Sequence, residues 1–377
     1  MKSRNHLGAL DLDGFMRRHW QREPLLIRGA IEGFEDPLAP EEVLQLAGSD
    51  EAVSRLVERR RGRWHLEHGP IPRARFRRLA PRDWTVLVQD TNHFSPRAAA
   101  LLARFDFIPH ARIDDVMVSY AVPGGGVGPH VDSYDVFLLQ GRGRRRWQIS
   151  RQADHAFVPG LPLRVLRRFV PEQEWVLEAG DMLYLPPGVA HHGVAESECL
   201  TWSVGFRAPT DAELARGFLD YLHDAVALDG QFGDAGAAPT RHPGEIPAAM
   251  LAHAHGAAGR IRWSAAMVRE FTGRHLSEPK AHVYFSPPAR ALAPAAFRRA
   301  AARAGLALDP KTRLLYSGAM FFINGESAAV DAASRPALRR LADRRAMPSG
   351  AAAPEGFWRL AHAWYARGLL HLAEDAR

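Results

Sequence analysis

Residues 123–132 of the 377-residue chain read PGGGVGPHVD and hold the first residues with a clear capacity for chemistry. A glycine-rich turn leads into a predicted strand that carries His130-x-Asp132. Because side chains alternate along a strand, His130 and Asp132 point to the same face. An imidazole and a carboxylate on one face can bind one metal ion together.

A second histidine motif follows at residues 177–192, LEAGDMLYLPPGVAHH. It predicts a strand, a turn, a second strand and a Pro-Pro-Gly bend that presents His191 and His192. Either histidine would complete a triad of two histidines and one carboxylate. Such a triad occupies one face of an octahedral ion, leaves three positions open and is typical of non-haem Fe(II) oxygenases. The alternative is that these histidines are only polar residues at the ends of a barrel.

Residues 143–149, GRRRWQI, place a cation in an apolar strand. Arg145 shares its strand phase with Trp147 and Ile149, which indicates that all three face inward. A buried guanidinium needs an anionic partner. A bound dicarboxylate fits, because guanidinium grips a carboxylate through two parallel hydrogen bonds. The alternative partner is an internal Asp or Glu.

The elements that must position these residues are mainly strands. Short β-rich pieces separated by glycine and proline predict strands at 84–89, 115–122, 130–140, 144–150, 174–178, 182–185 and 200–207. Such a series favours an antiparallel sandwich or barrel. Before it, residues 8–60 are expected to form mostly short helices with a first strand at 24–27. The charged run 58–63, ERRRGR, is interpreted as a solvated face or loop.

The pattern changes after residue 207. Thr210 and Glu213 have the form of a capping box, which opens a helix, and two more helices are predicted at 246–256 and 263–274. These helices either pack as an ordinary core or form a dimer surface. From residue 281 the order changes again, to a strand at 283–285, a helix at 293–304, strands at 313–316 and 320–323, and helices at 335–345 and 356–371. This order is similar to a winged-helix unit.

Composition excludes a disordered or fibrous chain, with 46% hydrophobic and 24% charged residues. The lone Cys199 excludes an internal disulfide and is expected to be a small buried residue. We find neither an apolar signal segment at the N-terminus nor an apolar stretch long enough to span a membrane, so a cytoplasmic protein is expected. The net charge of +7 lies in residues 286–377, because residues 1–285 sum to zero.

Residues 123–147, 180–195 and 201–209 together resemble the JmjC-type ribosomal oxygenases, whose bacterial branch hydroxylates an arginine of a large-subunit ribosomal protein. The resemblance implies a mainly β catalytic domain over residues 1–209, a double-stranded β-helix of the cupin/JmjC jelly-roll type. It further implies an α-helical dimerisation domain over 210–280 and a winged-helix-like α/β domain over 281–377. Fe(II) as cofactor, 2-oxoglutarate and O2 as co-substrates, and a homodimer follow from the same resemblance.

Carried over by position, His130 and Asp132 match the first two metal ligands of the family. His191 matches the third, because the family pattern is Pro-Pro-Gly-x-x-His, although His192 follows it directly.

Arg145 matches the residue that holds the distal carboxylate of 2-oxoglutarate, and Ser119 resembles a hydroxyl that assists it. Tyr134 shares the phase of His130 and Asp132, and either lines the substrate entrance or packs the barrel. The implied reaction releases succinate and CO2 and requires no protein acid or base.

We therefore expect a protein hydroxylase that acts on a ribosomal protein, at arginine or, as in relatives, at histidine. The alternative function is a non-enzymatic regulator in which a cupin sensor is joined to a DNA-binding winged helix. It rests on the basic helix predicted at 335–345. A weak contact of this basic C-terminal domain with RNA is a further expectation.

Overall fold

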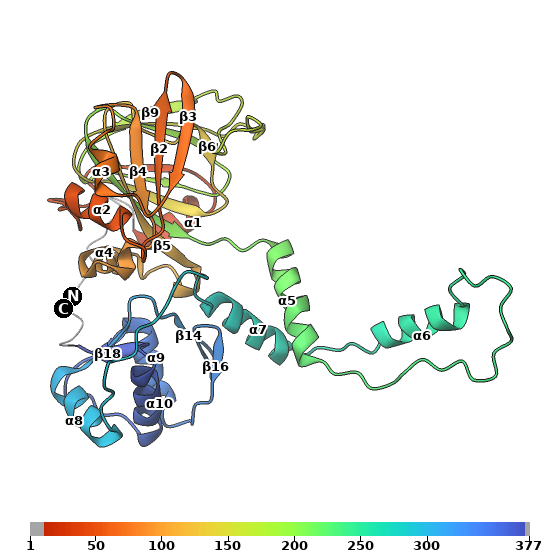
Figure 1. The fold of residues 1–377 in the computed structure, drawn as a ribbon. Coiled ribbons are helices and arrows are strands. Elements are labelled where there is room, and N and C mark those ends of the chain that lie inside the picture. Colours follow the sequence, from red (N-terminus) through yellow and green to blue (C-terminus); the bar gives the residue numbers. More distant parts are fainter. Residues whose placement is uncertain (1–10, 374–377) are drawn as a thin grey trace.

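The computed structural model describes residues 11–373 of the chain. Figure 1 shows a barrel of strands, a smaller C-terminal region beside it, and helices α5 to α7 that extend to one side. The expectation about a signal segment concerns residues 1–10, which lie outside the described residues.

The barrel consists of two antiparallel sheets. The larger sheet has the strand order β1-β10-β7-β12-β5-β4-β2-β3, and the smaller has the order β6-β11-β8-β9. The strands are β1 (Leu25–Ile27), β2 (Ser54–Arg60), β3 (Arg63–His68), β4 (Trp84–Val88), β5 (Ile113–Ala121), β6 (His130–Val131), β7 (Asp135–Gln140), β8 (Arg145–Ser150), β9 (Gln173–Leu177), β10 (Met182–Leu185), β11 (Ala190–Ala195) and β12 (Cys199–Phe206). The predicted antiparallel barrel is confirmed.

The larger sheet separates an outer apolar core from the barrel interior. On β5, Val116 and Val118 belong to the outer core, so Met117 and Ser119 point inward. Short helices cover the outer face: α1 (Leu12–Arg18), α2 (Pro40–Ala47), α3 (Arg73–Phe76) and α4 (Pro96–Leu102), with 3-10 turns η1 (Thr91–His93), η2 (Ala103–Phe105) and η3 (His110–Arg112). The fully buried Phe15 of α1 packs its ring 5.0 Å from that of Tyr184.

Three helices follow the barrel: α5 (Asp211–Ala225), α6 (Ala248–Ala258) and α7 (Ala265–Ser277). The predicted cap is present, because the Thr210 hydroxyl accepts the Glu213 N–H at 3.1 Å. In Figure 1, α6 and its flanking loops form an arm that stands away from the rest of the chain. Across the described residues, this helix and the others are too short or too polar to cross a membrane.

The C-terminal region mixes helices with two small sheets. Its strand orders are β17-β13-β18 and β14-β15-β16. Its elements are α8 (Pro294–Ala304), β13 (Leu306–Leu308), β14 (Leu314–Ser317), β15 (Met320–Ile323), β16 (Glu326–Ala328), α9 (Arg335–Arg344), β17 (Ala346–Met347), α10 (Glu355–Ala366) and β18 (Leu370–Leu372). They enclose a core of their own, separate from that of the barrel.

Two local predictions are wrong. Residues 54–60, expected within a mostly helical segment, form strand β2, which pairs with β3 in a hairpin, because Leu56 and Val57 are buried. The arginines that follow stay in solvent, so the solvated face predicted for residues 58–63 is present on this hairpin. Residues 283–285 are not a strand, since the chain there runs extended between the two regions without a ladder partner among the described residues.

The barrel and the C-terminal region are joined by an ionic cluster. The Lys280 ammonium lies 2.9 Å from Asp90, 3.2 Å from Asp114 and 3.6 Å from Asp115. Asp90, itself buried, also accepts from the imidazole of His282 at 3.0 Å. The contact between the two regions therefore depends on charges held in a largely buried place.

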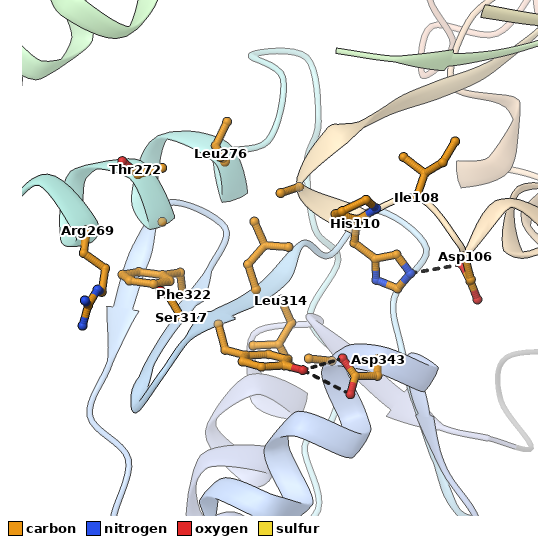
Figure 2. A pocket seen from close by; sticks show the side chains of 16 residues that line it. Asp106, Ile108, His110, Arg269, Thr272, Leu276, Leu314, Ser317, Phe322 and Asp343 are labelled. Atoms are coloured by element: carbon orange, nitrogen blue, oxygen red, sulfur yellow. Dashed lines mark hydrogen bonds and ion pairs between the residues drawn. The ribbon is translucent and has the colours of Figure 1, made fainter. Parts of the chain in front are cut away.

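A cavity of about 550 Å³ separates the same two regions on another side (Figure 2). Ile108 and His110 of the barrel, Thr272 of α7, and Leu314 and Phe322 of the C-terminal sheet line it. The two regions thus meet around a cavity rather than across one continuous apolar interface.

Replacing Lys280 with Met keeps the apolar stem but leaves the Asp90 and Asp115 carboxylates without their ammonium partner. We expect the free energy of unfolding to fall by about 3 kcal/mol, because an unpaired buried charge is costly. Urea denaturation at neutral pH measures this change. The control is Lys311→Met, which removes one hydrogen bond to the Tyr284 carbonyl and should cost about 1 kcal/mol or less. Equal losses in the two variants would contradict the role of the cluster.

Candidate active site

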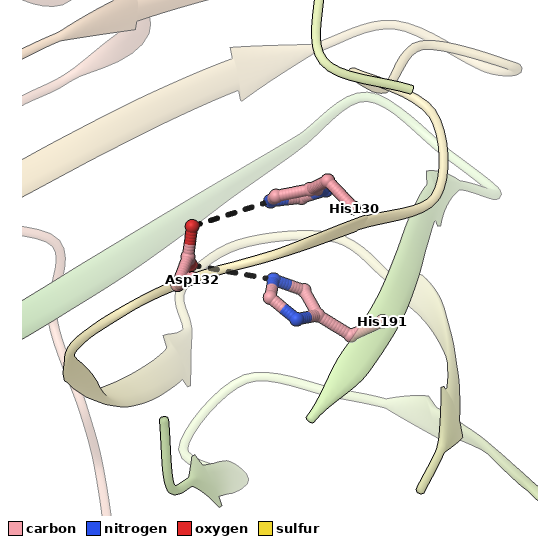
Figure 3. Close-up of side chains that lie close together, drawn as sticks. All are labelled: His130, Asp132 and His191. Carbon is pink, nitrogen blue, oxygen red and sulfur yellow. Dashed lines mark ion pairs between the residues drawn. The ribbon is translucent and has the colours of Figure 1, made fainter. Parts of the chain in front are cut away.

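Three of the predicted residues meet at one end of the barrel. His130 lies on β6, Asp132 follows it, and His191 lies on β11, directly opposite His130 in the strand register. One ligand atom from each residue lies within 4.8 Å of the others. Figure 3 shows both imidazoles turned toward the Asp132 carboxylate, with Nε2 of His191 3.5 Å and Nε2 of His130 3.9 Å from its oxygens.

Backbone carbonyls fix the orientation of both imidazoles. The Nδ1 atom of His130 lies 2.9 Å from the Gly128 carbonyl oxygen, and that of His191 lies 3.0 Å from the Val189 oxygen. A carbonyl only accepts, so each Nδ1 must carry the proton. Each Nε2 therefore presents its lone pair toward Asp132, which is the arrangement that outer hydrogen bonds impose on metal-binding histidines.

Burial keeps His191 neutral. Burial lowers its pKa to about 4, and the neighbouring His130 lowers it further, while Asp132 acts in the opposite direction. At neutral pH the imidazole is therefore unprotonated, which is the form that binds metal.

His192 points away from the triad, because it follows His191 on the same strand and takes the opposite face. Its ring lies 6.1 Å from that of Phe169, outside the group of three residues that could hold an ion. The geometry therefore favours His191 over His192 as the third ligand.

Arg145 lies inside the same barrel, as its strand phase predicts. It is buried, on β8 opposite Ala195 of β11, and its guanidinium carbon lies 5.6 Å from the centre of the Trp147 ring. Within the described residues, its Nε and Nη2 atoms are buried without any hydrogen-bond partner. The internal Asp or Glu that the sequence offered as an alternative partner does not bind these two atoms. They are therefore available to bind an external anion.

A glycine makes room for the aromatic ring between Arg145 and the triad. Gly193 pairs with Trp147 across β11 and β8, and a Cβ atom at Gly193 would lie 2.6 Å from that ring. The Trp147 ring centre lies 5.9 Å from that of His191. Arg145, Trp147 and His191 therefore lie along one wall of the barrel.

Ser119 belongs to a row of polar residues on the opposite wall. It pairs with Thr201 of β12, which pairs with Gln140 of β7, and all three are buried. The Thr201 hydroxyl donates to the Gln140 side chain at 3.1 Å. Sequence reasoning missed Thr201 and Gln140, although the alternation along residues 200–207 could have placed Thr201 inside.

Tyr134 lies near two acidic residues, because its ring, Asp114 and Asp115 all come within 3.8 Å of the position that a Cβ atom would take at Gly205. Burial raises its pKa well above the usual range, and Asp132, Asp115 and Asp114 raise it further. Its ring also contacts the apolar side chains inside the barrel, so both roles considered for it fit its position. Asp115, which the sequence reading missed, has its own pKa raised to about 6 by burial, with Asp114 and Asp90 adding to the rise and Lys280 opposing it.

These residues fit both groups that the fold implies. Two imidazoles and a carboxylate form a donor set suited to a divalent first-row metal with open positions. The unpartnered Arg145 guanidinium supplies a built site for a carboxylate in the same barrel.

Comparison with known proteins defines the class of the chain. The family models for the JmjC domain and the ROXA-like winged helix match residues 100–214 and 260–371. The chain is 34% identical, over 90% of its own length and 90% of the relative's, to the ribosomal protein uL16 3-hydroxylase of Escherichia coli. It belongs to the JmjC-domain ribosomal oxygenases, and it is a 2-oxoglutarate-dependent dioxygenase.

Particular relatives extend this likeness. A probable ribosomal oxygenase of Haemophilus influenzae is 39% identical over 54% of this chain and 51% of its own. The structure of Escherichia coli YcfD matches with a TM-score of 0.84 and 32% identity, over 96% of this chain and 98% of that one. A structure of YcfD in complex with cobalt and 2-oxoglutarate matches over the same shares with a TM-score of 0.79 and 32% identity.

Replacing His191 with Ala should weaken Co(II) binding by at least ~100-fold. Loss of a residue that only hydrogen-bonds to a metal ligand already weakens binding by up to about 100-fold, and His191 is itself a ligand. His192→Ala is the matched control and should leave the Co(II) affinity unchanged, because its imidazole points away from the triad. Calorimetric titration of each apoprotein with Co(II) measures the difference. Retained affinity in His191→Ala together with loss in His192→Ala would reverse the assignment.

Proposed function

We propose that this protein is an Fe(II)- and 2-oxoglutarate-dependent hydroxylase of a large-subunit ribosomal protein, acting on an arginine side chain. One observation carries the proposal: Nε and Nη2 of the buried Arg145 guanidinium have no hydrogen-bond partner among residues 11–373, and Arg145 lies in the same barrel as His130, Asp132 and His191. The Escherichia coli relative is named a ribosomal protein uL16 3-hydroxylase, which supports a ribosomal substrate. A ribosomal substrate also fits the cytoplasmic location expected from the sequence.

The residues have distinct tasks in this reaction. His130, Asp132 and His191 would hold Fe(II), and Arg145 would hold the distal carboxylate of 2-oxoglutarate, with Ser119 assisting it. When bound, iron and 2-oxoglutarate supply the oxidation: O2 gives one oxygen atom to succinate, formed with CO2, and one to a C–H bond of the substrate. The chain orients the reactants and excludes water, so we assign no acid or base.

The entrance of the barrel supports arginine rather than histidine as the target. The side chains of Tyr134, Asp114 and Asp115 lie close together, because all three come within 3.8 Å of the position that a Cβ atom would take at Gly205. Lys280 offsets part of this negative charge. A guanidinium is always protonated and would complement the remaining carboxylates, whereas a neutral imidazole would gain less from them.

A homodimer through residues 210–280 is part of the proposal. Eight of the twelve exposed large apolar side chains among the described residues lie between residues 219 and 268. Leu219 of α5 is 65% exposed and Leu251 of α6 is 57% exposed. A second copy of the chain would cover these apolar side chains, because exposed apolar residues that gather in one region mark an interaction surface.

The regulator alternative has less support. Of the arginines on the predicted basic helix, Arg339 donates to the Gly318 carbonyl, and Arg345 donates to the carbonyls of Thr312 and Asp309. These side chains hydrogen-bond within the C-terminal domain. We place this domain at residues 281–377 and the barrel domain at residues 1–209. A phosphate-binding face on this helix would retain mainly Arg340 and Arg344.

The test of the function is turnover of the recombinant ribosomal protein with Fe(II), 2-oxoglutarate and O2. We expect a mass gain of one oxygen atom, mapped to an arginine by fragmentation, with stoichiometric succinate. Arg145→Leu should raise KM for 2-oxoglutarate by at least ~30-fold, because it removes one partner of a buried charge pair. Absence of product from the wild-type protein, with Co(II) binding intact, would reject the substrate assignment.

The dimer is tested by sedimentation velocity of the full chain. We expect the wild type to sediment as a dimer and the double variant Leu219→Asp, Leu251→Asp as a monomer, because charges would replace the buried apolar contacts. Val170→Asp, at a 50% exposed position of the barrel, is the matched control and should remain dimeric. A monomeric wild-type protein would contradict the proposal.

A further inference from the structure

An arginine-rich surface covers the β2–β3 hairpin and α3. Residues 54–83 contain ten arginines, no lysine and three carboxylates, a net charge of +7. Because residues 1–285 sum to zero, this local charge is hidden in the domain total. We refer to the exposed arginines of this segment as the arginine surface: Arg59, Arg60, Arg61, Arg63, Arg73, Arg77, Arg78 and Arg82.

The hairpin presents its cations at a tight tip. Arg61 and Gly62 form the two-residue connection between β2 and β3, with φ angles of 49° and 78°. Two successive positive φ values define the turn that matches the twist of a hairpin. The neighbouring Arg60 and Arg63 pair across the ladder, so three guanidiniums project from one short tip.

Part of the charge is structural and part is free to bind. The buried Glu58 accepts two hydrogen bonds from Arg60 and is also paired with Arg75, which contacts Glu67 at 2.8 Å. By contrast, Arg61, Arg63, Arg77 and Arg78 have no carboxylate within 4.0 Å in the part of the chain that the structure describes. A hollow of about 530 Å³ opens between the hairpin, α3 and Arg82, and Arg61 and Arg78 line it.

This surface borders the active site. Arg59 lies over the ring of Trp64, 5.7 Å from its centre, and Trp64 would be 3.1 Å from a Cβ atom at Gly128. The Gly128 carbonyl in turn holds Nδ1 of the metal-site residue His130. A polyanion on the arginine surface would therefore lie beside the turn that leads into the metal-binding strand.

We propose that the arginine surface binds the phosphate backbone of RNA. Guanidinium matches phosphate with two parallel hydrogen bonds, and cations spread over a hairpin and a helix suit a repeating anion better than a single one. The tip sequence Arg60-Arg61-Gly62-Arg63 offers no apolar side chain to enter a lipid surface. RNA binding itself is independent of the hydroxylase activity. Its use, to hold an RNA-associated ribosomal protein at the barrel, rests on the proposed function.

The test is fluorescence anisotropy of a fluorescein-labelled RNA hairpin titrated with the full-length protein. We expect the triple variant Arg61→Glu, Arg63→Glu, Arg78→Glu to bind at least ~10-fold more weakly, with a salt dependence smaller by about 2 in log–log slope. These positions spare Arg60 and Arg75, which hold Glu58. The matched control, Arg290→Glu, Arg299→Glu, Arg303→Glu, makes the same charge change on exposed residues of the C-terminal region outside α9 and should bind like the wild type.

Three results would overturn the proposal. They are the absence of saturable RNA binding at low salt, an equal loss in the control variant, and displacement of the RNA by polyglutamate as readily as by unlabelled RNA, which would indicate an acidic protein partner. Turnover of a short peptide substrate should be unchanged in the triple variant. Failure of peptide turnover in the wild type would count against the hydroxylase function alone and leave the RNA result standing.

Discussion

The double pairing of β11 is the constraint on which the active site depends. One edge of this strand pairs with β6 and brings His191 opposite His130, and the other edge pairs with β8 and brings Ala195 opposite Arg145. A slip of one residue would turn His191 outward and His192 inward. The carbonyls of Gly128 and Val189 then orient the two imidazoles. The register therefore sets both the metal site and its distance from the anion site.

The metal-binding and anion-binding residues could be predicted because side chains alternate along a strand. His130 and Asp132 are two residues apart on a strand and therefore share a face. Arg145 shares its face with the apolar Trp147 and Ile149, which indicates that it points inward. The choice between His191 and His192 could not be made from the residues alone, because it depends on which face of β11 points into the barrel. Ser119 could be proposed, whereas its partners Thr201 and Gln140 come from strands distant in the sequence and need the register.

The hairpin at residues 54–68 could not be predicted for a related reason. Its buried residues Leu56 and Val57 are adjacent and therefore lie on opposite faces of β2, so they show no alternation, and the charged end of β2 lacks any apolar signal. The local positive charge of this segment was also missed, because carboxylates elsewhere in residues 1–285 balance the arginines of β2, β3 and α3 in the net charge. The ionic cluster around Lys280 was likewise invisible, because it joins residues 90, 114, 115 and 280 across two regions.

The position of Arg145 has a consequence for the order of addition. Its guanidinium lies in the barrel on β8, opposite Ala195, which packs with Ala121 and Cys199, while His191 lies on the neighbouring strand. A dicarboxylate held by Arg145 would therefore occupy the barrel interior, and a polypeptide bound over the triad would obstruct its entry. Kinetics should therefore be ordered, with the small co-substrate first and the protein second, and an excess of the protein substrate should slow turnover rather than saturate it.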